Sequence, residues 1–173
     1  LLRVYFLDIG QGDSIFIDSP THGRILLDGG PNSKVLTELG KILPFGDRRI
    51  DVVIESHPDA DHISGLVDVV QQYNVGAFLE PGVNSTNKVH VILENEIKDK
   101  NIPFILARRG TVINFGDGVK LEILFPNQDV TNWDTNDASI VAKLTYGDES
   151  FLLTGDSTKK AEYILLGLNS LND

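Results

Sequence analysis

Short runs of hydrophobic residues, separated by glycine, proline and polar residues, recur along most of the chain and predict strands. The segment 51–56 holds Val52, Val53 and Ile54 in succession, which is typical of a strand inside a sheet. The other predicted strands cover residues 4–9, 14–18, 24–28, 75–79, 104–107, 112–115, 120–125, 139–146 and 150–154.

Hydrophobic residues follow a helical period between several of these strands. Ile63, Leu66, Val67 and Val70 share one face of a helix that begins directly after a polar cluster at 57–62. Further helices are predicted at 33–43, 88–100 and 158–168. Because helices are inserted among a larger number of strands, the pattern predicts a layered α/β fold with mixed sheets, and residues 1–173 form one predicted domain.

Composition narrows the class of protein. Of the 173 residues 41% are hydrophobic, and 25 acidic against 15 basic residues give a net charge of −10. This negative net charge argues against non-specific electrostatic binding to nucleic acid or anionic lipid, but it does not exclude a metal site. No run reaches the roughly 18 apolar residues of a membrane span, no signal peptide is visible, and the lack of cysteine excludes disulfides and thiolate ligands. Because the chain begins at Leu1 and contains no methionine, we expect a piece of a longer protein.

Four potential metal ligands lie close together in Ser56-His57-Pro58-Asp59-Ala60-Asp61-His62, between a predicted strand and a predicted helix. A loop in this position can aim several side chains at one point, because rigid elements hold both of its ends. The imidazoles and carboxylates of His57, Asp59, Asp61 and His62 suit a divalent cation such as zinc, manganese or iron. The alternative is a solvated turn in which Asp61 caps the helix.

Weaker signals occur beside other predicted strands. Each is a polar residue at a strand end and, taken alone, indicates only a turn. They are Asp13 in Gly10-Gln11-Gly12-Asp13, Asp28 in Leu27-Asp28-Gly29-Gly30, Asn136 and Ser139 in Asn136-Asp137-Ala138-Ser139, and Asp156 in Thr154-Gly155-Asp156.

Three further residues have simple interpretations. His22 lies in a turn and His90 on a predicted surface helix, so both histidines are expected to be exposed to solvent. Trp133 lies in a polar loop, where it either stacks on a substrate or packs against the domain.

Taken together, five segments resemble the metallo-β-lactamase superfamily in order and spacing, from residue 4 to about residue 165. Asp59 fills the second position of the family motif His-x-His/Asp-x-Asp-His, which is typical of the ComEC-like branch, the domain attached to a bacterial DNA-uptake channel and its stand-alone relatives. The resemblance implies an αββα sandwich of two mixed β-sheets flanked by helices, with a metal site at one edge. The five segments are 6–14, 27–30, 56–62, 136–139 and 153–156.

The resemblance also implies a role for each site residue. His57 and Asp59 would bind one metal, Asp61 and His62 the other, and Asp156 would bridge the two. Asp28 would support these ligands through hydrogen bonds, and Asp13 would help to shape the pocket. Asn136 and Ser139 lie where many family members have a histidine ligand.

The last histidine motif of the family is absent, because no histidine follows His90. We therefore expect that motif beyond Asp173, and we expect each metal position of this chain to lack a ligand. The prediction is zero or one bound metal, held by Asp61, His62 and Asp156.

The function implied by the resemblance is that of a metal-dependent hydrolase, with Zn or Mn as cofactor and up to two ions in the intact protein. A divalent cation lowers the pKa of a bound water toward neutrality, and the catalytic residue Asp61 would orient this nucleophile. Since a carboxylate-rich ligand set favours phosphoesters, we predict a phosphodiesterase or nuclease. The alternative is a non-catalytic binding or structural module, and a β-lactamase is disfavoured because Asp59 replaces the usual histidine.

The resemblance bears on partners and location as well. The predicted partner is a phosphoester or nucleic-acid substrate, and the acidic charge favours a small phosphodiester or a tethered strand over a free duplex. The ComEC-like branch implies an extracytoplasmic location or attachment to a membrane protein. No stable membrane contact is expected from this segment itself, and the oligomeric state is open.

Overall fold

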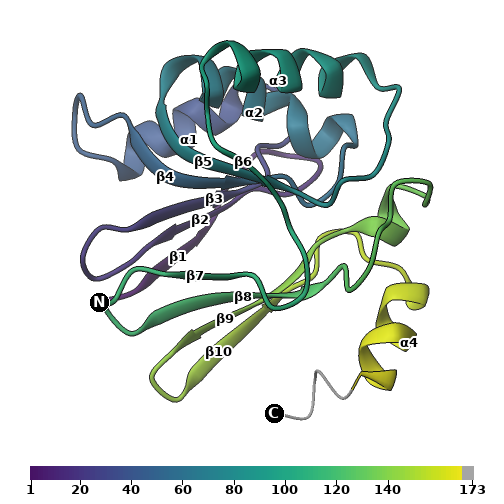
Figure 1. Ribbon diagram of the computed structural model, residues 1–173. Coiled ribbons are helices and arrows are strands. Elements are labelled where there is room, and N and C mark those ends of the chain that lie inside the picture. The colour runs from purple at the N-terminus through teal and green to yellow at the C-terminus, as the bar shows by residue number, and fades with distance from the viewer. Residues whose placement is uncertain (169–173) are drawn as a thin grey trace.

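Two β-sheets pack face to face in the computed structural model, which describes residues 1–168 (Figure 1). The first sheet has the strand order β1-β2-β3-β4-β5-β6, and the second has the order β10-β9-β8-β7. The first sheet contains β1 (Arg3–Phe6), β2 (Ile15–Asp18), β3 (Arg24–Leu27), β4 (Arg49–Ile54), β5 (Asn74–Glu80) and β6 (Phe104–Leu106). The second contains β7 (Val112–Asn114), β8 (Val119–Phe125), β9 (Val141–Tyr146) and β10 (Glu149–Leu153).

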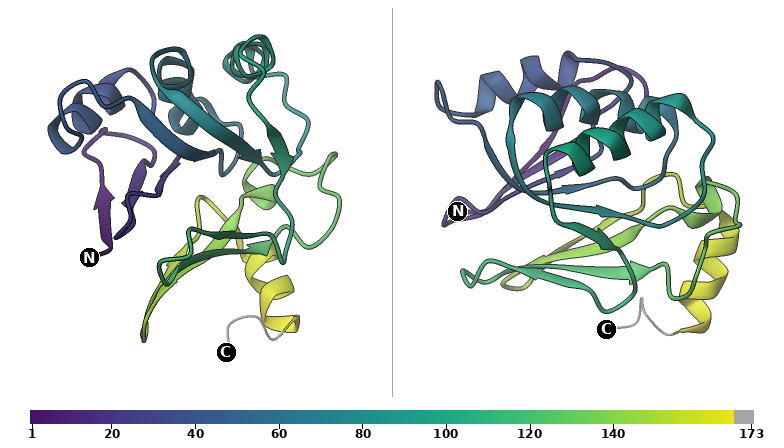
Figure 2. Two further views of the ribbon diagram at one scale, coloured as in Figure 1. Left: turned by 60° about the vertical axis from the view of Figure 1, so that its left-hand side comes forward. Right: turned by 45° about the horizontal axis from the view of Figure 1, so that its top comes forward.

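Helices cover the outer faces of both sheets. Helices α1, α2 and α3 lie on the first sheet, and α4 lies beyond the second sheet at one end (Figure 2). This arrangement confirms the predicted αββα sandwich, and the last residues of the predicted domain, 169–173, lie outside the described part. The helices are α1 (Lys34–Ile42), α2 (Ala60–Gln72), α3 (Lys88–Asp99) and α4 (Lys159–Gly167), and a short 3₁₀ turn spans Asn136–Ala138.

The prediction of two mixed sheets is correct for the first sheet only. There β1, β2 and β3 are antiparallel, whereas β3, β4, β5 and β6 run parallel. All described strand pairs of the second sheet are antiparallel. The physical reason is the connection: parallel neighbours need a crossover such as α2 or α3, whereas β7–β8 and β9–β10 are joined by short turns.

The first strand is shorter than predicted: β1 ends at Phe6, whereas the prediction extended it to Ile9. The chain turns here through a loop in which Gly10 and Gly12 have positive φ angles. Ile9 is nevertheless buried and belongs to the core beneath the helices. The hydrophobic run therefore continues past the strand because the loop returns this side chain to the core.

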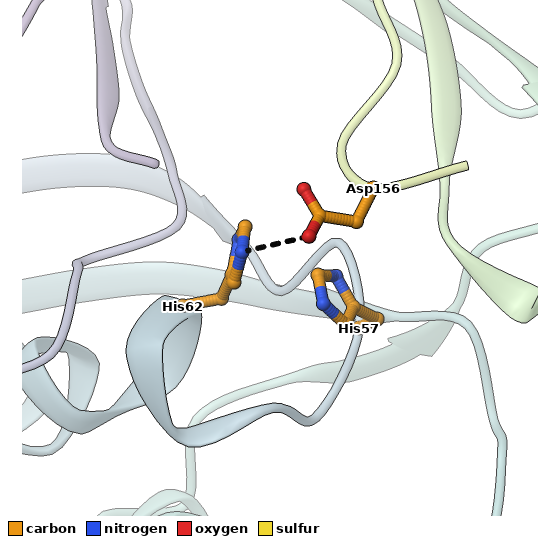
Figure 3. Close-up of side chains that lie close together, drawn as sticks. All are labelled: His57, His62 and Asp156. Carbon is orange, nitrogen blue, oxygen red and sulfur yellow. Dashed lines mark ion pairs between the residues drawn. The ribbon is translucent and has the colours of Figure 1, made fainter. Parts of the chain in front are cut away.

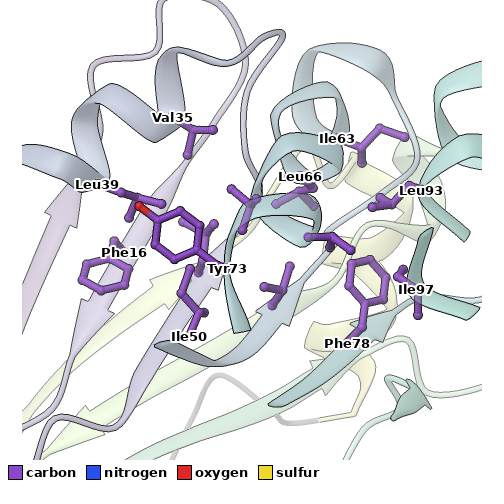
Figure 4. Close-up of a cluster of buried hydrophobic side chains, with 14 of the residues drawn as sticks. Phe16, Val35, Leu39, Ile50, Ile63, Leu66, Tyr73, Phe78, Leu93 and Ile97 are labelled. Carbon is purple, nitrogen blue, oxygen red and sulfur yellow. The ribbon is translucent and has the colours of Figure 1, made fainter. Parts of the chain in front are cut away.

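The core has two main layers, and strand alternation assigns residues to each. Phe16, Leu26, Val53 and Phe78 face the helices and pack with residues such as Leu66 of α2 (Figure 4). Their strand neighbours point to the opposite face and fill the space between the two sheets. This inner layer includes Ile17, Ile25, Ile54, Leu79, Leu121 and Leu144.

His90 corrects the expectation of a surface histidine. Its side chain lies in the first turn of α3 and is buried, and its Nε2 atom lies 3.3 Å from carboxylate oxygens of both Glu55 and Glu80. His90 was expected at the surface because it is a polar residue on an amphipathic helix. The sequence does not show that this helix covers two glutamates at the ends of β4 and β5. His22 is exposed, as predicted.

Trp133 packs against the domain. Its ring lies 6.1 Å from that of Phe125, and the ammonium group of Lys160 lies 3.8 Å from its centre. These contacts support the packing interpretation of this residue.

Within residues 1–168, the search for a membrane-crossing helix is negative, since every helix is too short or too polar.

Candidate metal centre

The candidate site lies where several strands end at the same edge of the sandwich. Asp28 directly follows β3, the segment 56–62 links β4 to α2, and Asp156 follows β10 of the second sheet. Because β3 and β4 are parallel neighbours, with Leu27 opposite Ile54, their carboxyl ends lie side by side. The fold thus brings Asp156 to the histidine motif although the two are far apart in sequence.

Three side chains form the centre of the site, and Figure 3 shows them converging. The Nε2 atom of His62 lies 3.6 Å from Oδ2 of Asp156, and the imidazole rings of His57 and His62 lie 4.1 Å apart between centres. One ligand atom from each of His57, His62 and Asp156 lies within 4.8 Å of the other two. The tightest set of donors therefore includes His57, whereas the sequence had favoured Asp61 for this place.

Asp28 is fully buried and forms hydrogen bonds with two residues of the segment 56–62. Its Oδ1 accepts a hydrogen bond from the backbone N–H of Ser56 at 2.8 Å, and its Oδ2 accepts one from Nδ1 of His62 at 2.9 Å. With Nδ1 donating to Asp28, Nε2 faces Asp156. It carries a proton there when the imidazole is charged, and it offers a lone pair to a cation when the imidazole is neutral. Asp28 therefore lies within hydrogen-bond distance of the motif, and its role as a support for metal ligands stays a prediction.

Ser56 had no assigned role in the sequence-based prediction. Its hydroxyl donates to Oδ2 of Asp28 at 2.5 Å, and its oxygen lies 2.9 Å from Nδ1 of His57. Because the hydroxyl proton points to Asp28, the serine oxygen is the acceptor for His57 Nδ1–H. Ser56 therefore links Asp28 to the imidazole of His57 by a chain of two hydrogen bonds. The only sequence signal was its position directly before the first histidine.

Electrostatics set the two histidines apart. Burial, and next the charge of His62, lowers the pKa of His57 and keeps it a neutral donor. Burial alone would lower the pKa of His62 as well, but the hydrogen bond to Asp28 and the charges of Asp28, Asp156 and Asp61 outweigh it and raise this pKa to about 9. Burial also raises the pKa of Asp13, on which His62, Asp28, Asp156 and His57 all act electrostatically. Asp13 therefore lies within the field of the site.

The other two carboxylates of the motif lie at its margin. Oδ2 of Asp59 is 3.6 Å from Nε2 of His57, and the Asp59 side chain is 40% exposed. Asp61 lies in the first turn of α2 and accepts a hydrogen bond from Nε2 of Gln11 at 3.1 Å. The helix-capping position belongs to Asp59 rather than Asp61, and its side chain makes no capping hydrogen bond.

Ser139 lies next to the site, and Asn136 begins the short 3₁₀ turn that directly precedes Ser139. Ser139 is fully buried, and the residue after it, Ile140, donates a backbone hydrogen bond to the carbonyl of Ser56. The side-chain oxygens of both Asn136 and Ser139 are buried and have no hydrogen-bond partner among residues 1–168.

Glycines allow the loops of the site to approach one another closely. A Cβ atom at Gly65 would lie 2.0 Å from the carbonyl oxygen of Gly29, and one at Gly12 would lie 1.9 Å from that of Asp61. Gly155 has a φ of 50°, and a Cβ there would lie 3.0 Å from Cβ of Ser56. These close approaches allow the loops that carry Asp13, Asp28 and Asp156 to lie against residues 56–65.

The donor set fits a divalent metal ion. His57 Nε2 is buried and has no hydrogen-bond partner in the described part of the chain, which is the state of an imidazole nitrogen prepared to bind a cation. Two imidazoles and carboxylates suit zinc or manganese, and the support from Asp28 is what such ligands require.

Replacing Asp28 with Asn should weaken metal binding at this centre about 10–100-fold. The amide keeps the size of the carboxyl group but cannot accept from His62 and Ser56 in the same way. Isothermal titration with Mn²⁺ measures the change, and Asp148→Asn in an exposed turn is the control. Equal affinity in Asp28→Asn and the control would contradict the role of Asp28.

The raised pKa of His62 predicts a pH dependence in two measurements. The folded pKa of about 9 lies above the ordinary value of 6.5, so the proton on His62 stabilises the metal-free fold fully below pH 6.5. This stability is lost as pH rises through 9, while metal affinity rises because the cation no longer competes with the proton. Thermal unfolding in EDTA and Zn²⁺ titration at pH 6.5, 7.5 and 9 test both trends. Stability that grows with pH, or affinity that falls, would contradict the assignment.

The chain is similar to known sequences. The family model described as Metallo-beta-lactamase superfamily matches residues 7–172. The chain is 29% identical over 178 residues to ComE operon protein 3 of Bacillus subtilis (strain 168), covering 92% of this chain but 23% of that protein. This similarity is consistent with the ComEC-like branch.

Solved structures share the fold. The metallo-beta-lactamase with a HARLDQ motif from Cronobacter sakazakii has a TM-score of 0.59 at 17% identity, over 87% of this chain and 58% of that one. The metallo-beta-lactamase fold protein YhfI from Bacillus subtilis has a TM-score of 0.52 at 19% identity, over 89% and 61%. The chain thus spans about three fifths of these structures. Since the family model covers nearly the whole sequence, the chain belongs to the metallo-beta-lactamase superfamily.

Proposed function

We propose that the chain is a phosphodiesterase or nuclease domain that uses a divalent metal, Zn or Mn. The observation that carries this proposal is the convergence of His57, His62 and Asp156, supported by a buried carboxylate. The superfamily is generally hydrolytic and metal-dependent, which supports the reaction class. The chain covers only 23% of its relative, so substrate and activity belong to the proposal.

The side chains have distinct tasks in this proposal. His57, His62 and Asp156 hold the cation, with Asp59 beside His57 and Asp61 beside His62 as further ligands. Asp28 and Ser56 accept hydrogen bonds from the Nδ1–H groups of the two imidazoles, which leaves both Nε2 atoms free to bind the cation. When bound, a divalent cation lowers the pKa of water and neutralises charge on a phosphoester. Asp61, held by Gln11, orients the attacking water and accepts its proton.

The carboxylates of the site favour a phosphoester over a lactam. Asp59, Asp61 and Asp156 surround two imidazoles, and such a set suits cations that neutralise the charge of a transferring phosphoryl group. The net charge of −10 disfavours tight binding of a free duplex, so the proposed substrate is a small phosphodiester or a single DNA strand.

Hydrolysis of two model substrates tests this function. With Mn²⁺ or Zn²⁺, the chain is expected to hydrolyse bis(4-nitrophenyl) phosphate or an end-labelled single-stranded oligonucleotide about 100-fold faster than in EDTA. The β-lactam nitrocefin serves as the comparison substrate and should remain intact. Metal binding without hydrolysis would support the non-catalytic module instead, and cleavage of nitrocefin alone would support a lactamase.

A further inference from the structure

A second group of ionisable side chains lies between the first sheet and α3, apart from the ligands described above. Glu55 directly follows β4, Glu80 is the last residue of β5, and His90 lies in the first turn of α3. Because β4 and β5 are parallel, with Ile54 opposite Leu79, the two glutamates end neighbouring strands side by side. By strand alternation both side chains share the face of Val53 and Phe78, which the helices cover.

The three side chains are buried and close together. Their exposed fractions are 1% for Glu55, 6% for Glu80 and 4% for His90. Nε2 of His90 lies 3.3 Å from Oε1 of Glu55 and 3.3 Å from Oε2 of Glu80. One ligand atom from each residue lies within 4.8 Å of the other two.

The contacts within this cluster leave several of its buried polar atoms without a hydrogen bond. Nε2 of His90 carries at most one proton for two carboxylates, and neither contact is shorter than 3.3 Å. Both oxygens of Glu55 and Nδ1 of His90 are buried and have no hydrogen-bond partner among residues 1–168. Two buried carboxylates thus face a single positive charge at most, which leaves the cluster short of one charge.

A cavity gives access to the cluster from solvent. It has a volume of about 650 Å³, and Glu80 and His90 are part of its wall. Glu94, one turn after His90 on the same helix, also lines it and is exposed. A small hydrated cation therefore has a path to the buried donors.

We propose that Glu55, Glu80 and His90 form a second binding site for a divalent cation of the Mn²⁺ or Zn²⁺ class. Two carboxylates and one imidazole are a ligand set that these cations accept, and a divalent charge balances both glutamates at once. The ion ties α3 to the ends of β4 and β5, next to the loop that carries His57. This proposal does not depend on the proposed hydrolytic function.

Counting bound Mn²⁺ in a chain that lacks the first centre tests the site. His57→Ala combined with Asp156→Asn removes two of the three tightest donors there. Equilibrium dialysis is expected to find one Mn²⁺ still bound to this double variant. Adding Glu80→Gln or His90→Gln should weaken that binding at least about 10-fold. Glu149→Gln and His22→Gln, at exposed positions, are the matched controls.

The unchanged chain provides a second measurement that does not rely on folding of the variants. In ¹⁵N-detected histidine spectra of the unchanged chain, an excess of the diamagnetic ion Zn²⁺ should give the imidazole nitrogens of His90, but not those of His22, the shift of a metal-coordinated imidazole. Loss of all Mn²⁺ binding in the double variant, unchanged binding after Glu80→Gln, or an unshifted His90 signal in excess Zn²⁺ would each overturn the proposal. The cluster would then be a protonated histidine held between two glutamates.

Discussion

Val53→Asp is expected to unfold the domain. Val53 is fully buried in β4, a central strand of the first sheet, where it pairs with Leu26 of β3 and Phe78 of β5 beneath the helices. A carboxylate there has no hydrogen-bond donor and no counter-ion among its apolar neighbours. Burying it costs on the order of 5 kcal/mol, which is comparable with the whole stability of a small domain.

Circular dichroism and thermal unfolding measure this loss directly. The matched control is Val112→Asp, because Val112 lies on the edge strand β7 and is 44% exposed. That variant should unfold within a few degrees of the wild type. A cooperative transition near the wild-type temperature in Val53→Asp would show that β4 is not at the centre of the sheet.

Asp61→Ala is expected to reduce hydrolysis about 100-fold, to the rate seen in EDTA, while the domain stays folded. The Asp61 side chain is partly exposed at the start of α2, and its described hydrogen bond is with Gln11. Removing it takes away the proposed proton acceptor and one carboxylate next to His62, but no part of the hydrophobic core. The measurement is the initial rate on bis(4-nitrophenyl) phosphate at saturating Mn²⁺.

Asp68→Ala is the control for this prediction, since Asp68 lies further along the same helix and outside the candidate site. It should retain the wild-type rate. Metal titration of Asp61→Ala separates loss of the ion from loss of proton transfer. Nearly full activity in Asp61→Ala, with the thermal transition unchanged, would remove Asp61 from the mechanism.

Local periodicity was sufficient to predict most elements of the fold. The succession Val52, Val53 and Ile54 indicated a central strand, and the spacing of Ile63, Leu66 and Val70 indicated α2. Such patterns report which face of an element is buried, and they act over a few residues only. They do not report which strands become neighbours or in which direction these run, so the second sheet was wrongly expected to be mixed.

In the candidate site too, the contiguous residues could be predicted from the sequence, whereas the residues remote in the chain could not. The motif from His57 to His62 is contiguous, so its residue types indicated a metal centre without knowledge of the fold. Asp28 and Asp156 entered only through the resemblance to a family, because each alone is a polar residue at a strand end. Ser56 had no role until the structure placed its hydroxyl between Asp28 and His57.

The sequence by itself determined the order of strands and helices, the acidic charge and the cluster of metal-ligand types after β4, because all of these are properties of neighbouring residues. The approach of Asp156 to His62 was implied by the family resemblance and is present in the tertiary structure. Only the tertiary structure decided that His57 rather than Asp61 completes the tightest donor set. It also decided that His90 is buried between Glu55 and Glu80. The physical reason is that these contacts join segments remote in the chain, whose distance is set by how two sheets and their helices pack rather than by local preference.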